Sequence, residues 1–152
     1  MGLTQADTTA ITAGFRETML AVQAGLLAAG KFSWAFFTPI YGAPSHTECT
    51  DWFRKTAPPL AGRALMMGFS HSTALALEDV VTFLLVRGPY AYLGWGWLHC
   101  VQPPPLPALV HGDYGIPIGN FTEEKSGVFT RVWSKATVTF DCNKYVATIT
   151  PV

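Results

Sequence analysis

The first 30 residues repeat apolar side chains at helical spacing. The repeat comprises Ile11, Phe15, Met19, Val22 and Leu26. Thr4 and Asp7 stand at the spacing of a capping box, and Gly30 follows the last apolar position. The pattern therefore predicts a helix that begins near Thr4 and ends at Gly30.

Between residues 32 and 97, short apolar runs alternate with helical patterns. Strands are predicted at 32–37, 63–69 and 90–97, and helices at 51–55 and 73–86. Strands that alternate with helices favour a parallel sheet, and the functional loops of such a sheet follow the carboxyl ends of its strands. We therefore expect the segments after the three predicted strands to share one rim. These segments are 38–45, 70–72 and 95–100.

The pattern changes after a proline-rich segment at 102–107, which we interpret as an extended linker. Beyond it, apolar and polar residues alternate, and strands are predicted at 128–133, 136–141 and 145–150, with turns at 134–135 and 142–144. Alternate residues of a strand share a face. The core face of the first strand is thus either Val128, Thr130 and Val132 or Phe129, Arg131 and Trp133. We divide the chain into an α/β part, 1–112, and a C-terminal loop and β-meander of the same domain, 113–152.

Composition narrows the classes of protein. Hydrophobic residues make up 49% of the 152 residues and charged residues 13%, so the chain has ample apolar material for a core. Lys and Arg number 10, and Asp and Glu number 10, so no net charge attracts nucleic acid or an anionic membrane. The longest apolar runs, such as 80–86, are too short to cross a bilayer. We expect no nucleic-acid partner and no membrane insertion.

The three cysteines, Cys49, Cys100 and Cys142, are widely spaced, which excludes a C-x-x-C metal or redox motif. Two states stay open: three reduced, mostly buried thiols, or one disulfide with a free thiol. Asn120-Phe121-Thr122 fits the acceptor pattern for N-glycosylation and hints at a secreted parent protein. The N-terminal residues do not form a secretory signal, so no compartment is assigned.

The C-terminal sequence DYGIPIGNFTEEKSGVFTRVWSKATVTFDCN resembles the last segment of glycoside-hydrolase-like (β/α)8 barrels of an uncharacterised kind found in algae and other protists. LVRGPYAYLGWGW similarly resembles the late barrel strand before that segment, and the resemblance spans roughly residues 1–150. A complete barrel has about 250 residues. The resemblance therefore implies an α/β fold that is a partial TIM-type barrel, about half of one, closed by an antiparallel meander. An exposed barrel edge would favour self-association.

Glycoside hydrolysis uses two carboxyl groups on either side of the scissile bond. Asp113 is the first candidate, because it follows the last α/β strand near the expected rim, although a turn role before Gly115 competes with catalysis. Glu48, in the long loop after the first strand, is the second candidate. The helical acids are expected to be solvated, and Asp141 to be an exposed strand end. The helical acids are Glu17, Glu78 and Asp79.

A saccharide site needs aromatic platforms for the apolar faces of sugar rings and polar groups for their hydroxyls. The candidates for this role are Tyr41, His71, Trp95, Trp97 and His99. The histidines have no metal-ligand spacing, so no metal site is expected. Phosphate-loop, dinucleotide-binding and G-x-S-x-G motifs do not occur in the sequence, so no cofactor is expected.

Two hypotheses of function follow. The first is a glycoside-hydrolase-like protein that acts on or binds a saccharide, as an incomplete domain. The second is a noncatalytic remnant or interaction module that keeps the scaffold without a complete catalytic pair. Further βα units encoded upstream of Met1 would favour the first.

Overall fold

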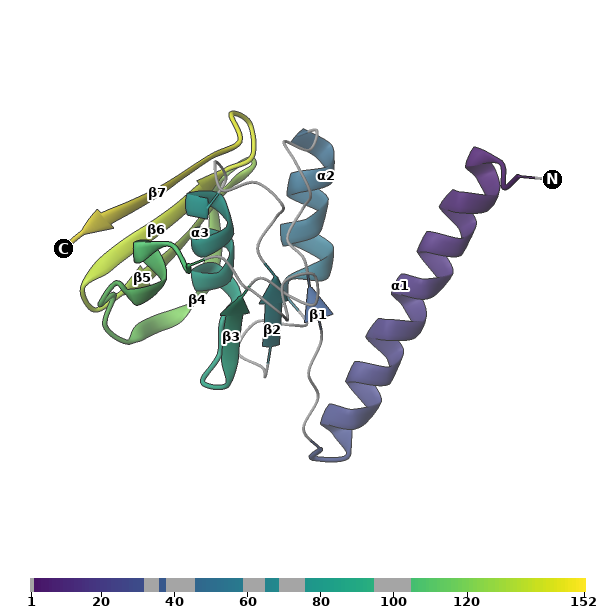
Figure 1. Cartoon of the computed structure of the whole chain (residues 1–152), viewed down its shortest axis with the longest axis horizontal. Coiled ribbons are helices and arrows are strands. Elements are labelled where there is room, and N and C mark those ends of the chain that lie inside the picture. The colour runs from purple at the N-terminus through teal and green to yellow at the C-terminus, as the bar shows by residue number, and fades with distance from the viewer. Residues whose placement is uncertain (1, 32–35, 38–45, 59–64, 69–75, 95–104) are drawn as a thin grey trace. The chain divides into compact units, whose positions relative to one another are not determined.

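The computed structural model describes residues 2–31, 36–37, 46–58, 65–68, 76–94 and 105–152 (Figure 1). The chain divides into two compact units, Met1–Trp34 and Ala35–Val152.

The first unit contains helix α1 (Gln5–Ala28), with a capping box of Thr4 and Asp7 at its start. The backbone N–H of Thr4 donates to Asp7 Oδ2 at 2.9 Å, and the N–H of Asp7 donates to Thr4 Oγ1 at 3.2 Å. These bonds satisfy amides that the first helical turn leaves without partners. The Thr4 hydroxyl also donates to Asp7 Oδ2 at 2.6 Å, and this bond, followed by the bond from the Thr4 N–H, lowers the pKa of Asp7. Gly30 has φ +65°, the left-handed conformation that ends helices. The predicted helix and its end at Gly30 are confirmed.

The second unit begins with a parallel sheet in the order β1-β2-β3. Its described strands are β1 (Phe36–Phe37), β2 (Leu65–Gly68) and β3 (Ala91–Gly94). Between β1 and β2 lie α2 (His46–Asp51) and the π-helical turn η1 (Trp52–Thr56), and between β2 and β3 lies α3 (Ala76–Val86). The predicted alternation of strands and helices, and the parallel pairing, are confirmed for the described residues.

The chain ends in an antiparallel sheet in the order β4-β5-β6-β7, preceded by the 3-10 turn η4 (Ala108–His111). Its strands are β4 (Pro117–Lys125), β5 (Val128–Trp133), β6 (Ala136–Asp141) and β7 (Val146–Pro151). β5 and β6 match their predicted bounds. The third predicted strand begins one residue later, because Tyr145 has φ 51° and belongs to the turn. β4 was not predicted, since most of its residues are exposed and its pairing with β5 is irregular.

Helix α3 supplies the centre of the core. Val80 to Val86 are all buried, and the helix contacts β6 and β7. Of the two possible core faces of β5, the structure uses Phe129, Arg131 and Trp133. Met67 of β2 belongs to the same core cluster. A helical segment that is buried on all sides needs an apolar sequence all round, and every residue from Val80 to Val86 except Thr82 is apolar.

Arg131 is a charged residue buried in this core, with 5% of its surface exposed. Its Nη1 donates to the backbone carbonyls of Leu84, Leu85 and Arg87 at 3.2, 3.0 and 2.8 Å, and its Nε donates to the carbonyl of Gly119 at 3.0 Å. The carbonyls of the last helical turn have no partner within the helix, so Arg131 supplies the missing donors for α3. Burial, together with the charge of Arg87, lowers the pKa of Arg131.

The indole ring of Trp133 contacts both arginines. The guanidinium carbon of Arg87 lies 5.2 Å from the ring centroid and that of Arg131 lies 5.4 Å from it. The negative face of an aromatic ring attracts cations, so these contacts stabilise both guanidinium groups. Trp133, 1% exposed, therefore fixes the C-terminal end of α3 against the end of β5.

We expect Arg131→Met to lower the free energy of unfolding by about 3 kcal/mol, because it leaves buried carbonyl groups without donors. Arg131→Lys should recover only part of this loss, since an ammonium group cannot reach the same set of carbonyls. The measurement is urea unfolding followed by circular dichroism. Lys144→Met, in an exposed turn, is the control and should change the free energy by less than about 0.5 kcal/mol. Equal stabilities of Arg131→Met and the control would contradict the role of Arg131.

Candidate functional site

The carboxyl ends of β1, β2 and β3 lie at one edge of the parallel sheet, because the strands pair in parallel. We call this edge the carboxyl edge. α2 follows β1 and α3 follows β2, and each helix leads back to the start of the next parallel strand. The N-terminal turns of both helices therefore belong to the carboxyl edge, where open α/β sheets bind their ligands.

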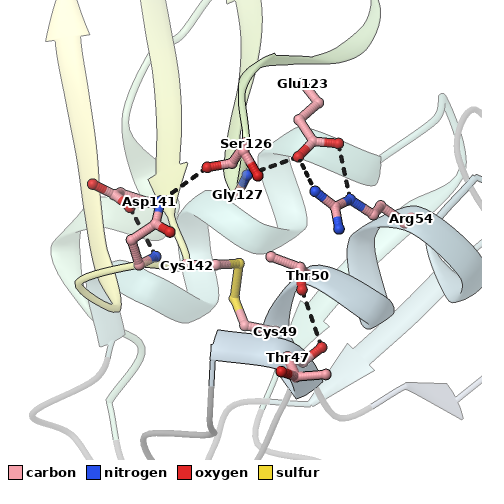
Figure 2. A network of polar contacts seen from close by, with 10 residues as sticks. Thr47, Cys49, Thr50, Arg54, Glu123, Ser126, Gly127, Asp141 and Cys142 are labelled. Atoms are coloured by element: carbon pink, nitrogen blue, oxygen red, sulfur yellow. Dashed lines mark hydrogen bonds and ion pairs between the residues drawn. A yellow bond between two sulfur atoms is a disulfide. The ribbon is translucent and has the colours of Figure 1, made fainter.

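A disulfide joins α2 to the turn between β6 and β7. It links Cys49 to Cys142, whose Cα atoms are 5.6 Å apart although 93 residues separate them in sequence (Figure 2). The interpretation as three reduced thiols is wrong for this pair, because folding brings α2 onto the β6–β7 turn. Both half-cystines are buried. Cys100 lies outside the described residues.

Glu123 of β4 anchors the neighbouring turn between β4 and β5. Its carboxylate accepts two hydrogen bonds from Arg54, with Nε to Oε2 at 3.0 Å and Nη2 to Oε1 at 2.6 Å. Oε1 also accepts the backbone N–H of Gly127 at 2.7 Å (Figure 2). These donors hold the pKa of Glu123 below its usual value. The planar fork of Arg54 thus fixes η1 to the β4–β5 turn.

Asp141 closes the β6–β7 turn. Its Oδ1 accepts the backbone N–H of Asn143 at 2.8 Å and the Asn143 side-chain amide at 3.0 Å. The same amide donates to the carbonyl of Ser126 at 3.0 Å, so it joins the two turns. Asp141 is partly buried rather than an exposed strand end, because it forms this turn.

Asp79 lies in the first turn of α3 with only 3% of its surface exposed. The prediction that it is solvated is wrong, because α3 packs against β6 and β7 and the N-terminal end of a helix favours a carboxylate. Burial, followed by the charges of Asp79 and Glu78, raises the pKa of Tyr145 from 10.0 to about 12. The β6–β7 turn, which contains Tyr145, therefore lies beside the N-terminal end of α3.

Asp113 is held at the other end of β6. Its Oδ1 accepts the backbone N–H of Gly115 at 3.1 Å, and Oδ2 pairs with the ammonium of Lys135 in the β5–β6 turn. Both contacts lower the pKa of Asp113, and 71% of its side chain is exposed. The Trp133–Ala136 end of the meander contacts Arg87, just past the C-terminal end of α3. The structure thus places Asp113 away from the carboxyl edge.

The segment that follows Asp113 is hydrogen-bonded to the β5–β6 turn. The backbone N–H of Ser134 donates to the carbonyl of Ile116 at 2.9 Å, and Ser134 Oγ accepts the N–H of Ile116 at 3.0 Å. Gly115 has φ +78°, and a Cβ there would lie 2.0 Å from Ser134 Oγ. Gly115 is therefore required both by its backbone conformation and by its close approach to Ser134.

Glu48 lies at the opposite end from Asp113. It belongs to the first turn of α2, exposed and next to the disulfide. Between the two acids runs β6, whose six residues span about 20 Å at roughly 3.3 Å per residue. The carboxyl pairs of glycosidases stand only about 5 to 9.5 Å apart. This arrangement does not favour Glu48 and Asp113 as a catalytic pair.

The predicted saccharide-binding residues lie outside the described residues. They are Tyr41, His71, Trp95, Trp97 and His99. Each belongs to the sequence that follows the carboxyl end of β1, β2 or β3. Asn120 lies on β4 and is exposed.

Neither a metal cluster nor a membrane helix is found in the described part of the chain. No group of three or more His, Cys, Asp or Glu side chains there is arranged to hold a metal ion. No described helix has both the length and the apolar character to cross a membrane.

Comparison with known proteins adds no relative. No protein-family model matches the chain, and no curated protein matches it.

Sequence reasoning missed Arg54, Asp79, Glu123 and Tyr145. Asp79 had a usable signal, because an acid in the first turn of a mainly apolar helix is stabilised by the N-terminal amides. Arg54 and Glu123 are 69 residues apart, so local spacing held no signal for their pairing.

We expect the double variant Cys49→Ser/Cys142→Ser to unfold more easily by about 3 to 5 kcal/mol, the amount expected from closing a loop of this size. The measurement is urea unfolding of the oxidised wild type and the variant. Adding a thiol reductant should lower the stability of the wild type and leave the double variant unchanged. Cys100→Ser is the matched control and should keep the response to reductant. If the free energy of unfolding of the wild type is the same with and without reductant, the disulfide is contradicted.

We expect Asp79→Asn to lower the pKa of Tyr145 from about 12 toward its usual value, because one neighbouring negative charge is removed. The raised pKa means that folding favours the neutral phenol, so this stabilisation is complete below pH 10.0 and disappears as the pH rises toward about 12. The measurement is the absorbance of phenolate at 295 nm, with Tyr145→Phe used to isolate the signal. Glu124→Gln, on the exposed end of β4, is the control. An unchanged Tyr145 titration in Asp79→Asn would contradict their coupling.

Proposed function

We propose that this chain binds a saccharide at the carboxyl edge of its parallel sheet. One observation carries the proposal: β1, β2 and β3 are parallel neighbours in sequential order, so the segments that follow them start from the same edge. These segments contain the aromatic and histidine residues named above. Ligands of α/β sheets bind outside the carboxyl ends of the strands.

The residue types in these segments suit a sugar. Tyr41, Trp95 and Trp97 offer flat apolar surfaces, and His71 and His99 offer hydrogen-bonding groups. Sugar rings present apolar C–H faces and hydroxyl edges, so a saccharide needs both kinds of contact. The braced N-terminal turns of α2 and α3 add polar groups at this edge, including Glu48.

The geometry supports binding better than hydrolysis by the predicted pair. Glu48 and Asp113 are attached to opposite ends of β6. The pKa of Asp113 is lowered by Lys135 and Gly115, whereas a general acid requires a raised pKa.

The proposal includes the fold: the α/β part of the chain would be part of a (β/α) barrel of the glycoside-hydrolase-like kind. If the chain is instead a noncatalytic interaction module, it should bind no sugar. Self-association through an open sheet edge stays a prediction.

We expect tryptophan fluorescence to change on titration with at least one oligosaccharide from a panel of β-1,4-glucan, β-1,4-xylan and β-1,3-glucan fragments. Tyr41→Ala should weaken this binding several-fold, up to about tenfold, because a stacked aromatic contributes about 0.5 to 1.5 kcal/mol and 1.4 kcal/mol is about tenfold in affinity. Tyr90→Ala is the matched control, since Tyr90 is 66% exposed and precedes β3 at the opposite edge. Equal loss in both variants, or no binding by the wild type to any sugar tested, would contradict the proposal.

Release of reducing sugar from the same panel separates binding from hydrolysis. The proposal expects binding without release by the wild type. Release that disappears in both Glu48→Gln and Asp113→Asn would restore the catalytic pair and overturn the assignment of a binding function alone.

A further inference from the structure

We propose that Asn120 on β4 carries an N-linked oligosaccharide. The proposal is independent of the saccharide-binding function, because it concerns the outer side of the antiparallel sheet and a covalent bond. The acceptor sequence is Asn120-Phe121-Thr122, and its Asn and Thr are the groups that N-glycosylation requires.

The strand directs the acceptor away from the core. Phe121 is partly buried, and its ring lies 6.1 Å from that of Phe53 and 6.3 Å from that of Phe129. Asn120 and Thr122, on either side of it, are both exposed. Neighbouring residues of a strand point to opposite faces, so the burial of Phe121 turns both acceptor residues to solvent. The folded chain therefore has room for a bulky group on Asn120.

A break in the β4–β5 pairing increases this exposure. Ile118 pairs with Val132 and Thr122 pairs with Thr130, so four steps along β4 match two steps along β5. Gly119 has φ +78°, and its carbonyl accepts Nε of Arg131. Asn120 lies within this bulge, outside the regular ladder, on a strand that pairs with β5 alone among the described strands. A glycan there breaks no described strand pairing.

The disulfide supplies the second, independent observation. A bond between Cys49 and Cys142 forms and persists in oxidising compartments and is rare in the reducing cytosol. N-glycosylation of Asn-X-Thr sequences modifies surface positions of secreted proteins. A chain that is oxidised at Cys49 and Cys142 thus meets the conditions in which Asn120 is modified.

The surface beside Asn120 suits a sugar. Ile118 is 57% exposed and its cross-strand partner Val132 is 44% exposed. Ile118 lies two residues before Asn120 on β4, so a sugar on Asn120 would lie near this apolar pair. A glycan would therefore shield exposed apolar area on the outer face of the sheet.

The transfer step uses a lipid-diphosphate-linked oligosaccharide as donor. Nδ2 of Asn120 attacks the anomeric carbon of the donor's first sugar, which forms the N–C bond. The bond from that carbon to the phosphate oxygen breaks, and the lipid diphosphate leaves with the electron pair. The amide proton passes to a base of the transferase. No oxidant or reductant is needed.

The test is cell-free translation of the full chain, fused after a secretory leader, in the presence of eukaryotic microsomes. The protease-protected product should lose mass on treatment with peptide N-glycosidase, and residue 120 should become Asp. Asn120→Gln and Thr122→Ala should abolish the shift, whereas Thr122→Ser should retain it. Asn143→Gln, which changes the other asparagine of the chain, is the matched control and should leave the shift intact.

The state of Cys49 and Cys142 is read from the same product by thiol alkylation under non-reducing conditions. A protease-protected wild type of unmodified mass overturns the proposal, whether or not its disulfide has formed. A shift that persists in Asn120→Gln also overturns it, because the glycan would then lie elsewhere.

Discussion

A buried guanidinium connects the two layers of the second unit. Arg131 projects from the inner face of β5 into the core and donates to carbonyls at the end of α3 and in β4. A charge in this position is tolerated because its hydrogen-bonding capacity is used by groups that would otherwise be unsatisfied. The helix, in turn, requires a donor from outside itself. The antiparallel sheet therefore supplies hydrogen-bond donors that the C-terminal end of α3 needs, so the α/β part of the unit depends on it.

The two ends of α3 are fixed by different chemistry. At the C-terminal end, the contacts are the charge-assisted hydrogen bonds of Arg131 and the cation–π contacts of Arg87 and Arg131 with Trp133. At the N-terminal end, buried Asp79 lies beside the β6–β7 turn, and Cys142 in that turn is bonded to α2. The turn therefore braces both helices that begin at the carboxyl edge. The residues predicted to bind sugar belong to the segments after the strands. The strands and the two braced helices would form the support for a site at this edge.

Elements whose pattern is local in the sequence were predictable, whereas contacts between distant residues were not. β5 and β6 alternate regularly and are flanked by clear turns, so their bounds were predictable. β4 was not, because its bulge at Gly119 breaks the period of two and its exposed face has no apolar alternation. The buried face of β5 contains Arg131, whose burial was not predictable because the carbonyls that it binds, at the end of α3, are 44 to 47 residues away in sequence. The same limit applies to the predicted catalytic pair. Each of Glu48 and Asp113 was a plausible candidate by its position in the sequence, but the distance between them depends on long-range contacts with opposite ends of β6.

The bond between Cys49 and Cys142 also changes the connectivity of the molecule. It closes a ring of backbone that contains β2, α3, β3 and the first three strands of the antiparallel sheet. A single backbone cut anywhere inside that ring leaves one covalent molecule, in which the two pieces stay joined at α2 and the β6–β7 turn. The segments that follow β2 and β3 lie inside the ring, whereas the segment that follows β1 lies outside it. The protein is thus able to lose chain continuity at two of the three segments of its candidate site without separating into fragments.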